Sequence, residues 1–534
     1  MTETITNTPN LTFLGLLIPL LPLIGFLVNG LLGKYLPKAL TGWIGSLSVL
    51  ASFICVLLIF KDLSASQSIR IDVFQWIAFG DKEITFGLWI DALTLIMMMV
   101  VTGVGFLIHL YSIGYMHDDE GFTRFFSYLN LFIFFMLLLV MGSNYLMMFI
   151  GWEGVGLCSY LLIGFWFKND AYNDAAQKAF VMNRIGDLGF LLGMFFILFN
   201  FGTLDIQSVR ELAPGLVSNS PLLIAITLLL FVGAIGKSAQ IPLYTWLPDA
   251  MAGPTPVSAL IHAAAMVTAG IFMVSRMSPL FELSNTALSF VLIIGAVTAL
   301  FMGFLGIVQN DIKRVVAYST LSQLGYMTVA LGVSAYSVAV FHLMTHAFFK
   351  ALLFLGAGSV IIGMHHDQDM RNMGGLRKYM PITWITSLLG SLALIGTPFF
   401  SGFYSKDSII EAAAESHLFG SGFAYFAVLA GVFITAFYSF RMYFLVFHGK
   451  ERWMQASAHH AHDDAHDDSH DEHHHGLGPN DKPHESPWVV TLPLILLAIP
   501  SVIIGFLTIE PMLFGDFFKG VITVDSEAHP AMAE

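Results

Sequence analysis

Apolar runs long enough to cross a lipid bilayer recur along this chain of 534 residues. A spanning helix needs about 20 such residues, and it satisfies its backbone polar groups internally. Hydrophobic residues make up 56% of the chain and charged residues 11%, against roughly 25% charged in soluble domains. The composition therefore excludes a soluble globular protein and predicts an all-α polytopic membrane protein.

We predict fourteen membrane-spanning helices from the apolar runs. The seventh and twelfth runs are too long for one plain helix and contain prolines, which remove backbone hydrogen bonds. Such breaks persist in membranes only where protein or water meets the freed backbone groups. The predicted spans are 11–33, 40–60, 88–114, 125–142, 144–167, 177–201, 221–251, 255–277, 287–309, 311–332, 335–363, 382–416, 421–447 and 488–510.

The two interrupted spans lie five helices apart, each in fourth place within spans 4–8 and 9–13. Because five is odd, the second set enters from the opposite side, as inverted repeats do. Lys237 and Lys406 lie beside the two breaks, which favours repeats over incidental prolines. The predicted units are spans 1–3 with an outer hairpin loop (1–124), a first repeat (125–277), a second repeat (287–447), a His-rich cytoplasmic loop (448–487), and span 14 with a short tail (488–534).

The distribution of basic residues predicts how the chain sits in the membrane. Loops after odd spans carry thirteen Lys and Arg, whereas loops after even spans and both termini carry six. The positive-inside rule then places the N-terminus outside and the 448–487 loop in the cytoplasm. We expect the chain to be a multi-pass protein of a bacterial inner (plasma) membrane. Alternating apolar and polar residues at 69–73 and 84–86 predict a β-hairpin in the outer loop 61–87.

Ionisable residues lie inside several predicted spans, where a charge costs roughly 2.5–3.5 kcal/mol on insertion scales. Membrane proteins keep such groups where they pair with one another or line a wet path, and proton relays are built in this way. The pattern therefore indicates transport of protons or cations. The residues are Glu153, Arg184, Asp187, Lys237, Lys350, Lys406 and Asp407, with His262, His342 and His346.

His342, His346 and Lys350 follow one another at intervals of four residues, which places them on one face of the eleventh span. Imidazole takes up and releases protons near neutral pH, so the three groups can form a relay. Core histidines with a snorkelling lysine are the alternative, but Lys350 lies mid-span, too far from either surface. His262 in the eighth span is expected to connect this face to Lys237.

The remaining charges are expected to pair or to end the path. We predict a Glu153–Lys237 pair whose separation changes during transport, with a static salt bridge as the open alternative. Arg184 and Asp187 are three residues apart and can pair along one helix, either as a plain internal pair or to tune the first site. Lys406 is expected to be the last relay group, and the adjacent Asp407 to face elsewhere.

Cofactor and metal sites are not indicated on this chain. Cys55 and Cys158 are too few for an iron–sulfur cluster, and no Cys-x-x-Cys-His haem site is present. Eight histidines between 459 and 475 lie among acidic residues without fixed ligand spacing, which favours a solvated loop over a weak zinc or copper site. Much of the net charge of −13 comes from this segment, and no basic surface indicates nucleic acid.

Several stretches resemble the distal antiporter-like subunits of respiratory complex I, known as subunit L in bacteria and subunit 5 in mitochondria. The resemblance implies fourteen core helices in two inverted five-helix repeats, with NADH, FMN, iron–sulfur clusters and quinone on partner subunits and an adjacent antiporter-like subunit as chief neighbour. It also implies that Glu153, Lys237, His262, His342, His346, Lys350, Lys406 and Asp407 occupy proton-path positions. The stretches are 115–126, Gly-Trp-Glu-Gly at 151–154, 237–251, 253–259 and 365–376.

Family members usually continue past the fourteenth span into a further span, a long lateral helix and an anchoring helix. This sequence ends at Glu534 without that lateral helix, so we expect either a truncated or split sequence or a subunit held by its neighbours alone. Three functions stay open: a proton-pumping subunit of a redox-driven complex, a cation/proton antiporter, and a zinc transporter. Lysine and histidine along the path favour protons, because sodium prefers oxygen ligands and cationic side chains repel it.

Overall fold

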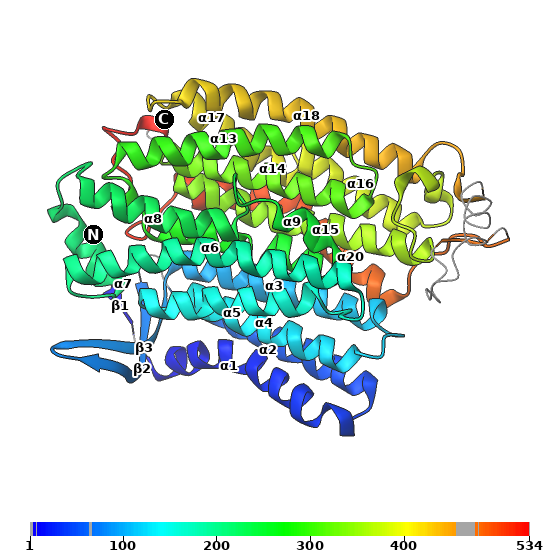
Figure 1. Ribbon diagram of the computed structural model, residues 1–534, viewed down its shortest axis with the longest axis horizontal. Coiled ribbons are helices and arrows are strands. Elements are labelled where there is room, and N and C mark those ends of the chain that lie inside the picture. The colour runs from blue at the N-terminus through cyan, green and yellow to red at the C-terminus, as the bar shows by residue number, and fades with distance from the viewer. Residues whose placement is uncertain (1–3, 7, 64–66, 455–475, 479, 533–534) are drawn as a thin grey trace.

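Long helices that lie side by side form nearly all of the molecule (Figure 1). The computed structural model describes residues 4–6, 8–63, 67–454, 476–478 and 480–532. The helices are α1 (Pro9–Leu32), α2 (Lys38–Asp62), α3 (Ala92–Tyr115), α4 (Phe122–Met141), α5 (Tyr145–Ile163), α6 (Asp170–Phe201), α7 (Ile206–Leu212), α8 (Pro221–Lys237), α9 (Trp246–Asp249), α10 (Thr255–Ala259), α11 (Thr268–Arg276), α12 (Ser278–Phe281), α13 (Asn285–Ile307), α14 (Ile312–Gly332), α15 (Tyr336–Gly363), α16 (Pro381–Ile395), α17 (Ser401–Glu415), α18 (Ser421–Phe447) and α20 (Trp488–Ile509).

The helical membrane architecture is confirmed. Within the described ranges, eleven helices are long and apolar enough to cross a membrane, and α8 and α16 are shorter apolar helices that each stop at a break. α14 is a further long helix, packed against α13 and α15, that carries more polar residues than its neighbours. The total of fourteen spans, the repeat boundaries and the direction of insertion stay predictions.

Both predicted helix breaks are present. α8 ends at Lys237, and residues 238–245 separate it from the single turn of α9. α16 ends at Ile395, where Gly396 adopts a left-handed conformation at φ 81°, and α17 resumes at Ser401. A residue with a side chain is strained at that φ, so glycine suits the point where this helix stops.

A third break was not predicted. The eighth predicted span contains a π-helical turn, η4 (Leu260–Ala264), after which α11 starts only at Thr268. Ala265 N donates to Leu260 O at 3.0 Å, the wider spacing of a π turn. No proline or glycine lies within that turn, so the local sequence carried no break signal.

The predicted hairpin is confirmed and is longer than expected. Strands β2 (Gln67–Phe79) and β3 (Lys82–Ile90) pair antiparallel, and β1 (Thr4–Ile5) joins β2 in parallel. Arg70 anchors the hairpin, since its guanidinium lies 2.8 Å from the Asp205 carboxylate at the start of α7. The hairpin lies at the same end of the bundle as both marked termini (Figure 1).

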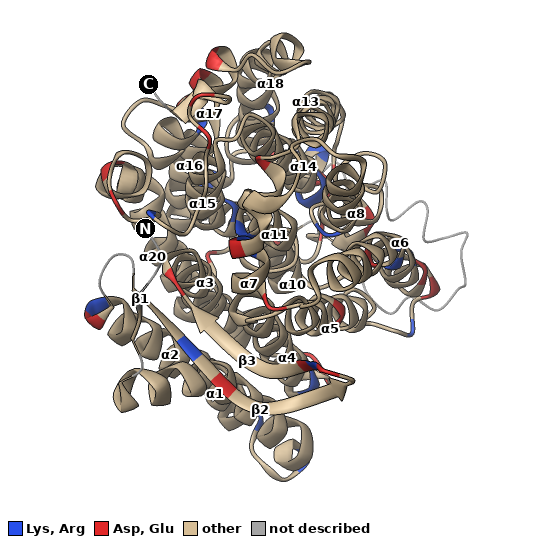
Figure 2. Cartoon of the chain, turned by 90° about the vertical axis from the view of Figure 1, so that its left-hand side faces the viewer, with Lys and Arg blue, Asp and Glu red and all other residues tan. Residues whose placement is uncertain are grey.

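α15 runs through the centre of the molecule. It packs against α3, α10, α14, α16, α17 and α20, and it is buried along almost its whole length. Seen from the hairpin end, most of the ribbon carries no charge, and only scattered charged residues lie among the helices (Figure 2). The short 3₁₀ turns are η1 (Gly33–Tyr35), η2 (Ala213–Gly215), η3 (Ala250–Ala252), η5 (Met370–Asn372), η6 (Leu376–Lys378) and η8 (Pro530–Met532), and η7 (Glu510–Phe514) is a second π turn.

Candidate functional site

Two groups of ionisable side chains lie inside the helix bundle. The first comes from α5, α6 and α8, and we call it the Lys237 cluster: Glu153, Arg184, Asp187 and Lys237. The second comes from α15 and α17, and we call it the Lys350 cluster: His342, His346, Lys350 and Lys406. His262, on the π turn η4, packs against α15 through the ring of Phe354.

The pairing within the Lys237 cluster differs from the prediction. Glu153 forms its ion pair with Arg184, while the Lys237 ammonium lies 3.9 Å from Asp187 Oδ1. The expected Glu153–Lys237 and Arg184–Asp187 pairs are therefore exchanged. The i, i+3 spacing on α6 allowed an internal pair, but the neighbouring helices bring opposite charges closer to each member.

Glycines allow this close packing. A Cβ on Gly186 of α6 would lie 3.0 Å from the Cα of Gly236 of α8, so these two helices touch backbone to backbone. A Cβ on Gly156 of α5 would lie 3.0 Å from the Lys237 Nζ atom. Small residues at helix crossings permit such approach in membrane proteins.

The Lys237 cluster runs from the side of the bundle to its interior. The side chain of Arg184 is 53% exposed and lies over the ring of Phe180, while Lys237 is fully buried. The carboxylates of Glu153 and Asp187 lie between these two cations. The cluster therefore carries two acidic and two basic groups, and its formal charge is balanced.

His262 is held by its own helix. Its Nδ1 lies 2.7 Å from the carbonyl oxygen of Ser258, so that nitrogen is the donor. The other nitrogen, Nε2, is buried and has no hydrogen-bond partner among the described residues. In the neutral ring this Nε2 is free to accept a proton.

The predicted stripe on α15 is confirmed as one face. His342 contacts Gln323 of α14 at 2.9 Å and Ser405 of α17 at 2.8 Å through its two ring nitrogens. Lys350 donates to Ser319 of α14 at 2.5 Å. His346 lies between them along the helix, with its ring centre 6.1 Å from that of His342.

Lys406 and Asp407 face different ways, as predicted. Lys406 is buried, and its ammonium lies 4.9 Å from the ring centre of Tyr326. Asp407 is exposed beside Glu411 on the outer side of α17. The structure therefore brings Lys406 into the Lys350 cluster and leaves Asp407 outside it.

Several neutral side chains complete the site and were not singled out from the sequence. Ser319 accepts hydrogen bonds from both Lys350 and Tyr438, and Ser405 contacts both His342 and Thr345. The sequence offered one signal for these neutral residues, which is glutamine within an apolar span. The buried amide of Gln323 contacts His342, and the buried Gln240 follows Lys237 at the break of α8. Within the described ranges, buried atoms without a hydrogen-bond partner include Lys237 Nζ, Gln240 Oε1, His262 Nε2, Gln323 Nε2, His346 Nε2 and Lys406 Nζ.

The part of the chain that the structure describes contains no group of three or more His, Cys, Asp or Glu residues placed to hold a metal ion. Most of the His-rich loop, residues 455–475, lies outside the described residues.

Comparison with known proteins gives consistent matches. Residues 142–437 match the family described as NADH:quinone oxidoreductase/Mrp antiporter, and residues 76–126 match the N-terminus of complex I chain 5. NADH-quinone oxidoreductase subunit L of Neisseria meningitidis is 61% identical over 97% of this chain and 78% of the relative. NADH-ubiquinone oxidoreductase chain 5 of Metridium senile is 47% identical over 93% of this chain and 78% of the relative.

Two solved structures share the fold. The Mrp complex from Dietzia sp. aligns with a TM-score of 0.78 and 24% identity over 95% of this chain, which spans 52% of that chain. The membrane-bound sulfane sulfur reductase, an archaeal respiratory complex, aligns with a TM-score of 0.78 and 23% identity over 97% of this chain and 99% of that chain. At these identities the matches bear on the fold alone.

Proposed function

The chain belongs to the family of NADH-quinone oxidoreductase subunit L and NADH-ubiquinone oxidoreductase chain 5, and from this premise we propose that it is a proton-translocating membrane subunit of such a complex. It moves protons from the cytoplasm to the outside along the Lys237 cluster, His262 and the Lys350 cluster. NADH oxidation, the flavin, the iron–sulfur clusters and quinone reduction belong to partner subunits, with an adjacent antiporter-like subunit and lipid as its immediate neighbours.

The observation that carries this proposal is the row of buried ionisable side chains between the two interrupted helices α8–α9 and α16–α17. Several of their polar atoms have no hydrogen-bond partner within the described residues, from Lys237 Nζ to Lys406 Nζ. Buried polar atoms ordinarily form hydrogen bonds with protein groups or with internal water, and water next to titratable groups conducts protons. A purely structural subunit would gain nothing from these costly groups.

The Lys237 cluster acts as the electrostatic control of the path. Lys237 interacts with the carboxylates of both Asp187 and Glu153. A proton that arrives on either carboxylate removes a negative charge and weakens the stabilisation of the Lys237 ammonium. Lys237 then releases its own proton through water at Gln240 toward Nε2 of His262.

The Lys350 cluster carries the proton onward. His262 passes it to the α15 face, where His346 lies one helical turn from both His342 and Lys350. Gln323 and Ser405 hydrogen-bond to the two ring nitrogens of His342, and Ser319 accepts a hydrogen bond from Lys350. Lys406 is the last group, and Asp407 draws the released proton toward the exposed side of α17.

A cation/proton antiporter is the alternative within the same family. Sodium binding calls for several carboxylate or carbonyl oxygens around one position. Asp407 faces away from the Lys350 cluster, so the inner members of that cluster are lysine and histidine. These groups favour proton transfer over sodium transfer.

The experiment is proton transport by the whole complex reconstituted in proteoliposomes and driven by NADH. Lys350→Met keeps the bulk of the side chain and removes its titration, and we expect it to lower proton translocation by at least about tenfold, a barrier increase of ~1.4 kcal/mol. Lys34→Met, at an exposed lysine outside the path, is the matched control and should transport like the wild type. Wild-type transport by Lys350→Met would rule the relay out, and sodium-dependent transport at an unchanged proton rate would favour the antiporter.

A further inference from the structure

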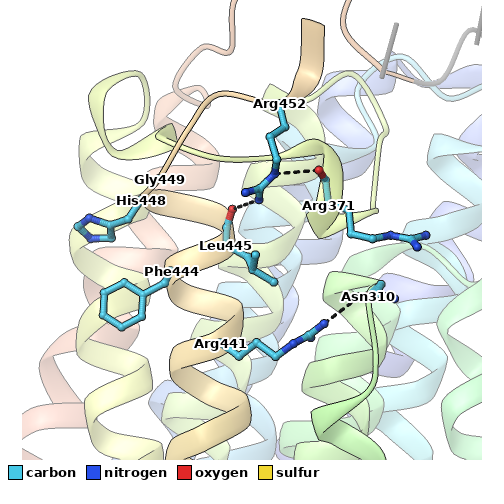
Figure 3. Close-up of a pocket in the computed structure, with 8 residues that line it drawn as sticks. All are labelled: Asn310, Arg371, Arg441, Phe444, Leu445, His448, Gly449 and Arg452. Atoms are coloured by element: carbon cyan, nitrogen blue, oxygen red, sulfur yellow. Dashed lines mark hydrogen bonds between the residues drawn. The ribbon is translucent and has the colours of Figure 1, made fainter. Parts of the chain in front are cut away.

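A basic cavity of about 670 Å³ lies at the far end of α18 from the hairpin (Figures 1 and 3). It forms where α18 ends and the chain turns past the loop that precedes α16. None of the proposed relay residues lines it. The lining residues are Asn310, Arg371, Arg441, Phe444, Leu445, His448, Gly449 and Arg452.

Two of the three arginines in this cavity are held only by neutral oxygens. Arg441 donates to the carbonyl of Gln309 at 2.5 Å and to Asn310 Oδ1 at 2.8 Å. Arg452 donates to backbone carbonyls of Met370, Arg371 and Leu445 at 2.8–3.1 Å. Figure 3 shows both guanidinium groups reaching into the same region between α18 and the neighbouring loop.

The charge of the cavity is therefore not balanced by the residues that the structure describes. Arg371 pairs with Asp369 at 2.8 Å, but Arg441 and Arg452 have no carboxylate ion-pair partner among the described residues. Burial and the nearby Arg377 lower the pKa of His448, so this imidazole is neutral at pH 7 and adds no charge. The two uncompensated guanidinium groups call for an anion.

An apolar face leads away from the cavity along the helices. Phe433, Phe437 and Phe444 of α18 are 74%, 49% and 54% exposed, and their spacing of four and seven residues places them on one side of the helix. Val308, just past the end of α13, is 65% exposed and precedes the residues that hold Arg441. Since α13 packs along α18, the exposed face spans both helices.

We propose that this cavity binds the phosphate headgroup of an anionic phospholipid whose acyl chains lie along the exposed face of α13 and α18. Guanidinium groups present a rigid fork that matches phosphate oxygens, and basic pockets between membrane helices bind lipid headgroups. The exposed phenylalanine face favours a lipid over a free phosphate, because a soluble anion would contact only the arginines. The bound lipid joins the end of α18 to the loop at Arg371.

The test counts the lipid that the purified complex retains. The complex is washed in detergent, supplied with equal phosphatidylglycerol and phosphatidylcholine of the same chain length, repurified, and analysed by mass spectrometry. Wild type should hold more phosphatidylglycerol per complex than Arg441→Gln, with no change in phosphatidylcholine. The affinity for this one lipid should fall about fivefold for each arginine removed, so a site that is half-filled in the wild type should be about one-sixth filled in the variant.

Matched variants distinguish the loss of a positive charge in the cavity from a general effect on folding or assembly. Lys168→Gln removes an exposed lysine outside the cavity and should retain lipid like the wild type. Arg452→Gln removes the second guanidinium that has no ion-pair partner and should also lose the phosphatidylglycerol, which keeps the test valid if Arg441→Gln does not assemble. Phe437→Ser should weaken retention of phosphatidylglycerol without loss of either guanidinium.

Three results would overturn the proposal. Equal phosphatidylglycerol content in wild type, Arg441→Gln and Arg452→Gln would show that the cavity holds no such lipid. Displacement of the lipid by excess glycerol phosphate, with no effect of Phe437→Ser, would identify a soluble phosphate site instead. Phosphatidylglycerol that binds only after deletion of 456–475, which removes six acidic residues, would identify that segment as the occupant of the cavity in the intact chain.

Discussion

The Lys237 and Lys350 clusters both place ionisable side chains inside the helix bundle, but their members have different partners. In the Lys237 cluster, two carboxylates face two cations, and the ion pairs come from three different helices. In the Lys350 cluster, lysine and histidine contact hydroxyl and amide oxygens, while the nearby Asp407 faces outward. The first cluster balances its cations with carboxylates, whereas the second has no carboxylate among its members.

This difference gives each cluster its own part in transport. A buried ion pair keeps its charges as long as both partners remain, and loss of one partner costs about 3–5 kcal/mol. A proton added to a cluster of lysine and histidine meets only repulsion and neutral dipoles, so it moves on easily. We therefore expect substitutions in the first cluster to stop transport, and substitutions in the second to slow it.

The largest effect is expected from Lys237→Gln. The change removes the cation beside Asp187 at the break of α8, so charge coupling to the rest of the path is lost. NADH-driven proton uptake into proteoliposomes should fall at least about 100-fold, a barrier increase of ~2.7 kcal/mol. The complex should also lose thermal stability, because Asp187 is left buried without its partner.

The double variant Lys237→Gln with Asp187→Asn sharpens this prediction. It removes both charges, so stability should return toward the wild type while transport stays lost. Recovery of transport together with stability would mean that the pair only fixes helix packing, and the contrast between the two clusters would then disappear.

The next effect concerns the α15 face. His346→Ala lengthens the gap between His342 and Lys350 from one helical turn to two, about 11 Å along the axis. Water bridges part of that gap, so transport should slow about 20-fold without being lost. His342→Ala combined with His346→Ala should be much slower than either single variant. A double variant that transports at the wild-type rate would show that protons do not follow this helix.

Ser319→Ala should have a smaller effect, confined to the Lys350 cluster. It removes the acceptor for the Lys350 ammonium, and a lost hydrogen bond to a buried polar group costs about 1–3 kcal/mol. Proton translocation should slow about tenfold. Ser159→Ala is the matched control in α5, since this buried hydroxyl bonds only to the Gly156 carbonyl at 3.0 Å. Equal rates for both variants would mean that Ser319 does not support the path.

The sequence predicted the features that depend on local pattern. Apolar runs and prolines marked the helices and the breaks at Lys237 and at Gly396, and the four-residue spacing placed three titratable groups on one face of α15. The exchange of partners between Glu153 and Lys237 was not predictable, because it depends on how close α5, α6 and α8 approach. The π turn at His262 was also missed, since its alanine-rich sequence suits an ordinary helix equally well.

The smallest predicted effect tests whether that close approach matters for transport. Gly156→Ala would add a methyl group 3.0 Å from Lys237 Nζ, so the flexible lysine must shift by a few tenths of an ångström. The shift alters the distance from Lys237 to Asp187, already 3.9 Å, without removal of any charge. We expect a two- to fivefold slower proton translocation, roughly 0.4–1 kcal/mol in the barrier, at nearly unchanged stability. The corresponding control is Gly390→Ala in α16, where the added methyl would meet leucine side chains of α15 next to Lys350 and should leave the rate unchanged. If Gly156→Ala and Gly390→Ala behave alike, the position of Lys237 does not limit transport, and the Lys237 cluster acts through its charge alone.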